Sequence, residues 1–199
     1  MTKDTFTIDA RKEACPRPVI MTKKKLDEIG EGIVTAIVDN EVAKENVSKL
    51  ANSLSYEFTV EEKDNDYYIS INKGNIKIEE QASNSKLADL TIALTSDRMG
   101  RGDDKLGKIL MKSFIYTLSE TLPYPETIVL YNSAVRLSCE GSEVLDDLRK
   151  LEDAGVEIIS CGTCLDFLEI KDNLRLGSIS NMYTIYEKIS QAGKNISIG

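Results

Sequence analysis

The chain has 199 residues, enough for one large domain or two small ones. Its net charge of −8 is shared by both halves, since residues 1–80 carry 12 basic and 16 acidic side chains and residues 81–199 carry 13 and 17, so nucleic acid is not an expected partner. Apolar runs are too short to span a membrane and the first residues lack a signal-peptide core, so we expect a cytoplasmic protein. Histidine is absent, which excludes Cys-His and Ser-His-Asp catalysis within the chain.

The first 78 residues alternate strand and helix patterns. An apolar stripe at helical spacing and two alternating segments around a polar turn predict a βαβαββ order, a two-layer sandwich with two helices on one face of the sheet. The predicted elements are strands Thr5–Asp9, Ile33–Val38, Tyr56–Glu61 and Tyr67–Asn72 and helices Pro16–Ile29 and Glu41–Leu54. Residues 79–86 are polar and aperiodic, and we expect a linker there, between domains 1–78 and 87–199.

Residues 87–199 repeat strand–helix units with apolar strands, which indicates a parallel sheet covered on both faces, a three-layer α/β/α domain. The predicted strands are Leu87–Thr95, Thr127–Tyr131, Val156–Ser160 and Asn195–Ile198, and the predicted helices are Asp104–Leu122, Ser142–Ala154, a short one from Cys164, and Asn181–Gln191. We expect helix 104–122, apolar on most sides, to be well buried behind an N-cap at Asp103. Helix 181–191 is expected to place Met182, Ile185, Tyr186 and Ile189 on one side.

The motif Cys15-Pro16-Arg17-Pro18 is the candidate site of the first domain. A cysteine at a helix start meets the positive end of the helix dipole and several unpaired backbone N–H groups, which favour the nucleophilic thiolate. Pro16 at the first helical position and Pro18 in the first turn are both tolerated and stiffen the chain around the sulfur. Arg17 and Arg11 are expected to stabilise an anionic sulfur. We therefore predict a thiolate site rather than a buried structural cysteine.

Cys161-Gly162-Thr163-Cys164 is the second candidate site, because it follows an apolar strand and opens a helix. Chemistry in parallel sheets collects at the carboxyl ends of the strands. We assign Cys161 as the nucleophile and Cys164 as the resolving or relay thiol, close enough to attack a mixed disulfide or persulfide. A pair of purely structural cysteines is the alternative.

Cys139 lies in the loop after another predicted strand, so we expect it at the same sheet edge as Cys161. It is either an accessory thiol or a semi-exposed structural cysteine, and Glu140 beside it disfavours a thiolate. A zinc site would need four ligands, and without histidine Cys139 and Cys15 would have to complete the Cys161/Cys164 pair. We predict no metal and no cofactor.

The first half resembles the TusA-type sulfur carriers, also called the SirA-like family, over about residues 4–73. The resemblance lies in the C-P-x-P motif at Cys15, the preceding IDARKEACP and the βαβαββ order. The second half is similar to DsrE/DsrF-type domains over about residues 88–198, through SDRMGRGDDKLGKIL and the cysteine after GVEIIS. The sulfur-accepting cysteine of that family maps onto Cys161, whereas Cys139 and Cys164 are not general to it.

Both domains in one chain is the arrangement of YedF-like proteins, associated with selenium metabolism. The resemblance implies a sulfurtransferase-like carrier that relays sulfane sulfur or selenium as a cysteine persulfide or perselenide. It also implies a cysteine desulfurase or similar donor, an acceptor such as selenophosphate synthetase, and a homo-oligomer built through the second half. Two alternatives stay open: a dithiol oxidoreductase centred on Cys161 and Cys164, and a redox- or metal-sensing module that uses the same cysteines.

Overall fold

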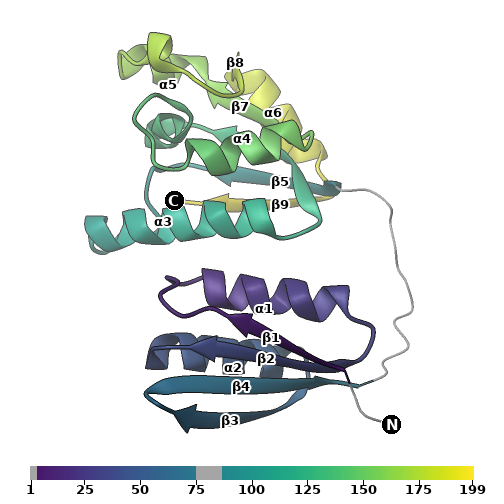
Figure 1. Ribbon diagram of the computed structural model, residues 1–199. Coiled ribbons are helices and arrows are strands. Elements are labelled where there is room, and N and C mark those ends of the chain that lie inside the picture. The colour runs from purple at the N-terminus through teal and green to yellow at the C-terminus, as the bar shows by residue number, and fades with distance from the viewer. Residues whose placement is uncertain (1–3, 75–86) are drawn as a thin grey trace. The chain divides into compact units, whose positions relative to one another are not determined.

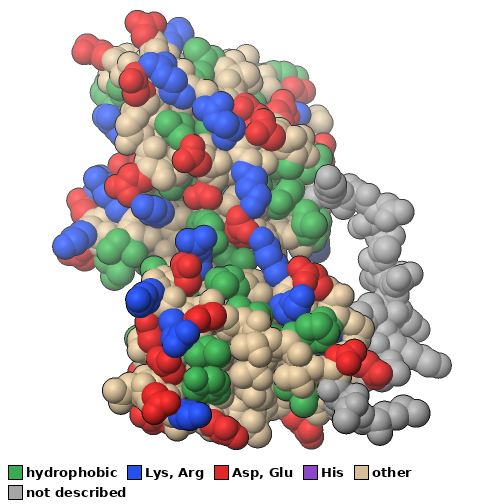
Figure 2. Space-filling model, in the orientation of Figure 1, with side chains coloured by type: hydrophobic (Ala, Val, Ile, Leu, Met, Phe, Trp, Pro, Cys, Tyr) green, Lys and Arg blue, Asp and Glu red, His purple; other side chains and the backbone are tan. Residues whose placement is uncertain are grey.

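The computed structural model describes residues 4–74 and 87–199. The chain divides into two compact units, Met1–Gln81 and Ala82–Gly199. The linker expected at residues 79–86 lies outside the described residues. Figure 1 shows that each unit has its own sheet and its own helices. Acidic and basic side chains are interspersed over the visible face of each unit in Figure 2.

The first unit has the predicted βαβαββ order. Its elements are β1 Thr5–Asp9, α1 Arg17–Glu28, β2 Gly32–Val38, α2 Glu41–Ser53, β3 Glu57–Lys63 and β4 Asp66–Lys73. The strands lie in the order β1-β2-β4-β3, with β1 parallel to β2 and the other neighbours antiparallel. The hairpin between β3 and β4 turns on Asp64 and Asn65, which both have positive φ, as a two-residue hairpin turn requires.

One face of this sheet carries the core of the first unit. Every second residue of β2 is buried, and Val34 and Ala36 pair in register with the buried Ile71 and Ile69 of β4. The same cluster contains Leu26 from α1 and Val47 and Ala51 from α2. Both helices therefore cover the same face of the sheet, which confirms the two-layer prediction and holds the start of α1 beside α2.

A buried lysine closes the end of α1. Lys73, the last residue of β4, is 3% exposed, and its Nζ donates hydrogen bonds of 2.7 Å to the backbone oxygens of Leu26 and Ile29. The last carbonyls of a helix lack partners within the helix, and a cation there also complements the negative end of the helix dipole. Lys73 thus ties the end of the sheet to the end of α1.

The second unit is built on a parallel sheet of strand order β8-β7-β6-β5-β9. Its elements are β5 Leu87–Leu94, α3 Asp104–Glu120, β6 Tyr124–Leu130, η1 Asn132–Ser138, α4 Leu145–Asp153, β7 Glu157–Cys161, α5 Gly162–Phe167, η2 Lys171–Asn173, β8 Ser178–Ser180, α6 Met182–Gln191 and β9 Lys194–Ile198. Consecutive residues at the end of β6 are all buried, because helices cover both faces of the sheet (Figure 1). The three-layer prediction is confirmed. Within residues 4–74 and 87–199, no helix is long and apolar enough to cross a bilayer.

Two helices of this unit differ from the sequence prediction. The expectation that α3 is buried on most sides is wrong, since Leu106, Ile109 and Leu110 are 53%, 54% and 41% exposed. A single stripe of α3, with Met111 and Ile115, enters the core, so an apolar composition all round did not mean burial all round. The N-cap at Asp103 is confirmed, because its carboxylate accepts a 2.9 Å hydrogen bond from the N–H of Leu106.

The four side chains predicted to lie on one side of α6 differ in burial. Ile185 is buried and Ile189 packs against the core, whereas Met182 and Tyr186 are exposed. The long thioether and the amphipathic tyrosine tolerate water, and of these four side chains the two isoleucines make the contact with the core.

Candidate functional site

Cys15 lies exposed in the loop between β1 and α1. The helix begins at Arg17, and Pro16 is its N-cap rather than its first helical residue, because the Pro16 carbonyl accepts the N–H of Ile20 at 3.2 Å. Pro18 is inside the first turn and buried, as expected, and its carbonyl accepts a 2.8 Å hydrogen bond from the buried hydroxyl of Thr22. The cysteine is therefore held at the outer end of a well-anchored helix start.

The backbone at this helix start offers the sulfur fewer donors than the sequence suggested. Pro16 and Pro18 carry no N–H. The N–H of Arg17 donates to the carbonyl oxygen of Ala14 at 2.9 Å. The two prolines therefore offer the sulfur no backbone donor and the N–H of Arg17 is already engaged, so the expectation of several unpaired N–H groups is not met within the motif.

A side chain from α2 supplies the donor instead. The Nδ2 of Asn46 donates to the Sγ of Cys15 over 3.6 Å. The helix that carries it starts at the N-cap Asn40, whose side chain accepts the N–H of Ala43, and buries Val47 next to Asn46. Sequence reasoning missed Asn46. The sequence feature that could have revealed this residue is an amide side chain next to the buried stripe of α2, because α2 shares a hydrophobic core with α1.

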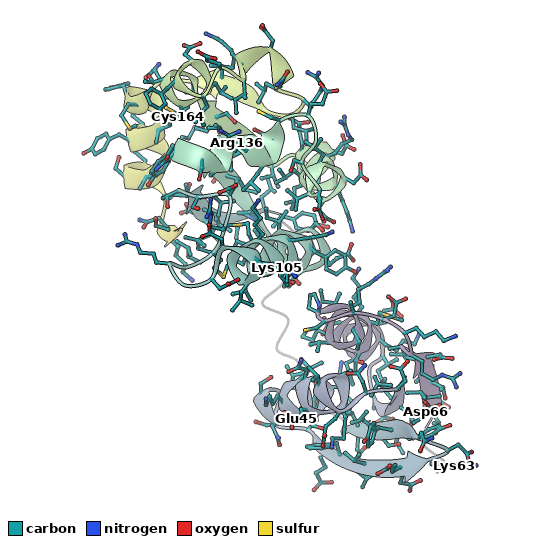
Figure 3. All side chains as sticks on the ribbon, turned by 90° about the vertical axis from the view of Figure 1, so that its left-hand side faces the viewer. Glu45, Lys63, Asp66, Lys105, Arg136 and Cys164 are labelled. Carbon is teal, nitrogen blue, oxygen red and sulfur yellow. The ribbon has the colours of Figure 1, made fainter. Side chains whose placement is uncertain are left out.

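The two cations predicted to serve Cys15 both contact carboxylates. Arg11 donates to Asp9 at 2.8 Å from its Nε and to Asp66 at 3.0 Å from its Nη1. Its guanidinium lowers the pKa of Asp9 to about 2, chiefly through the side-chain hydrogen bond. Arg17 forms an ion pair of 3.2 Å with Glu13. Figure 3 shows Asp66 near Lys63 at the hairpin of β3 and β4, so Arg11 bridges β1 to that hairpin.

In the second domain, Cys161 and Cys164 both lie at the carboxyl edge of the sheet, where β7 ends and α5 begins; Figure 3 labels Cys164. Cys161 is the last residue of β7 and is 2% exposed. Cys164 follows in α5 and is partly exposed. Its Sγ accepts a 3.1 Å hydrogen bond from the backbone N–H of Asn132, which begins η1 just after the neighbouring strand β6. This hydrogen bond links the segment that follows β7 to the segment that follows the adjacent strand β6.

The environment of Cys164 favours its thiol form. Burial raises the pKa of Cys164, and its hydrogen bond with Cys161 raises that pKa further, while the N–H of Asn132 acts in the opposite direction. The helix α5 has six residues, and so short a helix supplies little dipole to offset burial. The N–H of Asn132 is therefore the group on which a sulfur anion at this position would depend.

Cys139 is a buried residue and not a semi-exposed one, as one of the sequence alternatives had it. It is 4% exposed, follows the 3₁₀ helix η1, and donates its S–H to the carbonyl oxygen of Val135 at 3.2 Å. Burial is the main cause of its raised pKa, whereas the carboxylate of Glu140 is paired with Arg175. Across the described residues, no group of three or more Cys, Asp or Glu side chains is arranged to hold a metal ion.

Comparison with known proteins identifies the first domain. Residues 6–73 match the family model described as sulfurtransferase TusA. A crystal structure of the SirA-like protein from Desulfitobacterium hafniense is 39% identical, with 35% of this chain and 97% of that chain covered, at a TM-score of 0.34. Through its first domain the chain belongs to the TusA family of sulfurtransferases.

The C-terminal region resembles two further solved structures. The ychN protein from E. coli is 17% identical, with 57% of this chain and 99% of that chain covered, at a TM-score of 0.43. The protein of unknown function MTH1491 from Methanobacterium thermoautotrophicum is 19% identical, with 54% and 96% covered, at a TM-score of 0.41. Among curated proteins, none matches the chain.

Proposed function

We propose that the chain is a cytoplasmic carrier that takes up sulfane sulfur or selenium on Cys15 as a persulfide or perselenide. The observation that carries this proposal is an exposed cysteine at the start of α1 in a TusA domain, with an amide donor aimed at its sulfur. Exposure lets a donor protein reach the sulfur. The amide of Asn46 stabilises negative charge on it in the attacking thiolate.

The first step is thiolate exchange with a donor persulfide. The thiolate of Cys15 attacks the terminal sulfur of the donor's R–S–SH, a new S–S bond forms at Cys15, and the donor's own S–S bond breaks. The donor cysteine leaves as a thiolate, and the proton stays on the transferred sulfur. No electrons are gained or lost overall, so the step needs no redox cofactor.

The second step passes the atom to the Cys161/Cys164 pair by the same exchange. From the sequence we assigned the accepting role to Cys161. Cys161 is only 2% exposed, whereas Cys164 is partly exposed, which supports Cys164 as the thiol that an incoming persulfide meets first. Attack of Cys161 on the inner sulfur of Cys164–S–SH then forms the Cys161–Cys164 disulfide and releases hydrogen sulfide, or hydrogen selenide from a perselenide. In that release the transferred atom is reduced and the two cysteines are oxidised.

A dithiol oxidoreductase is the second candidate function. The C-x-x-C spacing of Cys161 and Cys164, at the junction of β7 and α5, favours it, since two thiols at that spacing can form a disulfide. It assigns no role to Cys15 and its amide donor, so the carrier accounts for more of the chain. The two candidates predict different products on the cysteines.

The proposed donor is a cysteine desulfurase or a similar persulfide-bearing enzyme, and the proposed acceptor is one such as selenophosphate synthetase. Sulfur and selenium travel by the same thiolate chemistry, and the selenium role rests on the YedF-like arrangement of domains. Exposed apolar side chains on α3 and α6 support a homo-oligomer formed through the second domain.

Intact-protein mass spectrometry tests the function. Wild type and each single Cys→Ser variant are incubated with a cysteine desulfurase and cysteine. The carrier predicts a gain of one sulfur mass that requires Cys15, with sulfur on Cys164 or Cys161 appearing later. An unchanged sulfur count, with a loss of two protons that requires Cys161 and Cys164, would instead identify the dithiol oxidoreductase.

A further inference from the structure

A cavity of about 320 Å³ opens in the second domain between α3, η1 and the loop that leads to α4. Its floor is apolar, formed by the buried side chains of Met111, Leu137 and Val144. Its rim is charged. Cys161 and Cys164 are not among the residues that line it, so within the described second domain it is separate from the cysteine pair.

The acidic side chains of the rim are all neutralised by cations. Asp97 pairs with Arg98 at 3.3 Å. Glu143 pairs with Lys112 at 2.7 Å, which lowers the pKa of Glu143. The third carboxylate, at Glu140, is held by Arg175, as described above. Each rim carboxylate therefore has an ion-pair partner before any ligand arrives, although Arg98 also pairs with Asp104.

Two further cations of the rim have no such match. Lys108 on α3 and Arg136 on η1 line the cavity and are exposed. Within residues 4–74 and 87–199, neither forms an ion pair with a carboxylate. The lining holds three acidic and three basic side chains, so its formal charge is balanced, but Lys108 and Arg136 keep their donors for a ligand. Two such cations above an apolar floor suit the acid group and the apolar part of an amphipathic anion.

The position of the cavity is one where α/β domains bind ligands. Asp97 follows β5, and Arg136 and Leu137 follow β6, so the cavity lies beyond the carboxyl ends of two adjacent parallel strands. Its volume is at the lower end of the range for small-molecule sites, about 300–1,000 Å³. A ligand of a few to roughly ten carbon atoms is therefore the expected size class.

We propose that this cavity binds a small organic anion. The acid group of the ligand contacts Arg136 and Lys108, and its apolar part lies against Met111, Leu137 and Val144. The proposal does not depend on sulfur transfer, because the cysteines take no part in it.

Three ligands of matched length test the proposal on the full-length protein: octanoate, octanol and octylamine. Each is titrated into ¹⁵N- and methyl-labelled protein below its micelle concentration, and chemical-shift changes are followed at Met111, Leu137, Val144 and Gly141. Octanoate is expected to bind saturably there, about fivefold or more tightly than octanol, because the rim adds attraction for its carboxylate. Octylamine is expected to bind weakest, since Arg136 and Lys108 repel an ammonium group.

The variants Arg136→Gln and Lys108→Gln remove one rim cation each. Each is expected to weaken octanoate binding about threefold to tenfold and to leave octanol binding unchanged. Lys105→Gln is the matched control, because Lys105 is exposed on the same helix α3 (Figure 3) and does not line the cavity. The proposal is overturned if octanoate shifts no cavity residue, if it binds no better than octanol, or if Lys105→Gln weakens it as much as Arg136→Gln.

Discussion

The amide Nδ2 of Asn46 lies 3.6 Å from the Sγ of Cys15, although 31 residues separate them in the chain. Pro16 and Pro18 have no N–H to offer the sulfur and the N–H of Arg17 donates to Ala14, whereas the side chain from α2 does donate to it. A donor amide stabilises the anionic sulfur and orients it. This contact joins a structural feature, the packing of α2 beside α1, to the proposed chemistry.

Asn46→Ala is expected to slow sulfur loading of Cys15. Removing one hydrogen bond to a partly solvated anion costs about 1 kcal/mol, which corresponds to a rate about fivefold lower. Quenched-flow loading from a cysteine desulfurase, read by intact mass, measures the rate. Asn52→Ala on the same helix is the control, because Asn52 is exposed and its side chain makes no hydrogen bond within the described residues. Equal rates for the two variants would show that the amide does not act on the sulfur.

Arg11→Gln is expected to change the loading rate by less than about twofold, because an exposed cation already paired elsewhere contributes little at Cys15. Its effect should appear at Asp9, whose pKa should rise from about 2 towards its ordinary 3.8 once the guanidinium is gone. A ¹³C NMR titration of the Asp9 carboxyl follows this change. A loading defect as large as that of Asn46→Ala would mean that Arg11 leaves its carboxylates to serve Cys15.

Lys73→Met is expected to destabilise the first domain by about 2–3 kcal/mol, since two helix-end carbonyls lose a charged donor and stay buried. Urea unfolding of the full chain, monitored by amide signals of α1 and β4, measures the loss. Signals from the second domain serve as the internal reference and should not move. The exposed Lys63→Met provides the comparison, and a similar loss in both variants would argue against a specific role for Lys73.

Alkaline pH is expected to destabilise the second domain in part through Cys139. Burial raises the pKa of Cys139 above its ordinary 9.0, so the folded state keeps the proton to higher pH than the unfolded chain does. Its contribution is therefore complete below pH 9.0 and is lost as pH rises from there through the folded-state pKa. The free energy of unfolding, measured between neutral and alkaline pH, should fall less steeply in Cys139→Ala than in wild type. Lost packing in the variant lowers this free energy at every pH and does not change the slope. Identical slopes in the two proteins would contradict this.

Hydrophobic periodicity was sufficient for the architecture of both domains. The buried stripe of α2 at Val47 and Ala51 and the apolar strand β6 both carry patterns that fix their place in a layer. The same patterns could not show that β8, three residues long, pairs beside β7, because so short a strand has no period. Nor could they show which side of α3 faces water. Apolar residues lie on most sides of that helix, and only tertiary packing decides which of them contact the sheet.

The cysteines of both sites could be found from sequence, but their surroundings could not. Asn46 and Lys73 act through contacts to residues 31 and 44–47 positions away, and no local pattern reports such distances. The burial of Cys161 relative to Cys164 depends on how α5 packs over the strand end. A local motif predicts reactive residue types, while access and hydrogen-bond partners follow from tertiary packing.

Sulfur loading of a protein with a single cysteine tests the central claim most directly. In the variant Cys139→Ser/Cys161→Ser/Cys164→Ser only Cys15 remains, and incubation with a cysteine desulfurase and cysteine should add one sulfur mass that dithiothreitol removes. The variant Cys15→Ser, which keeps the other three cysteines, should take up little or no sulfur. Loading of Cys15→Ser to the wild-type level would contradict the assignment of Cys15 as the first acceptor.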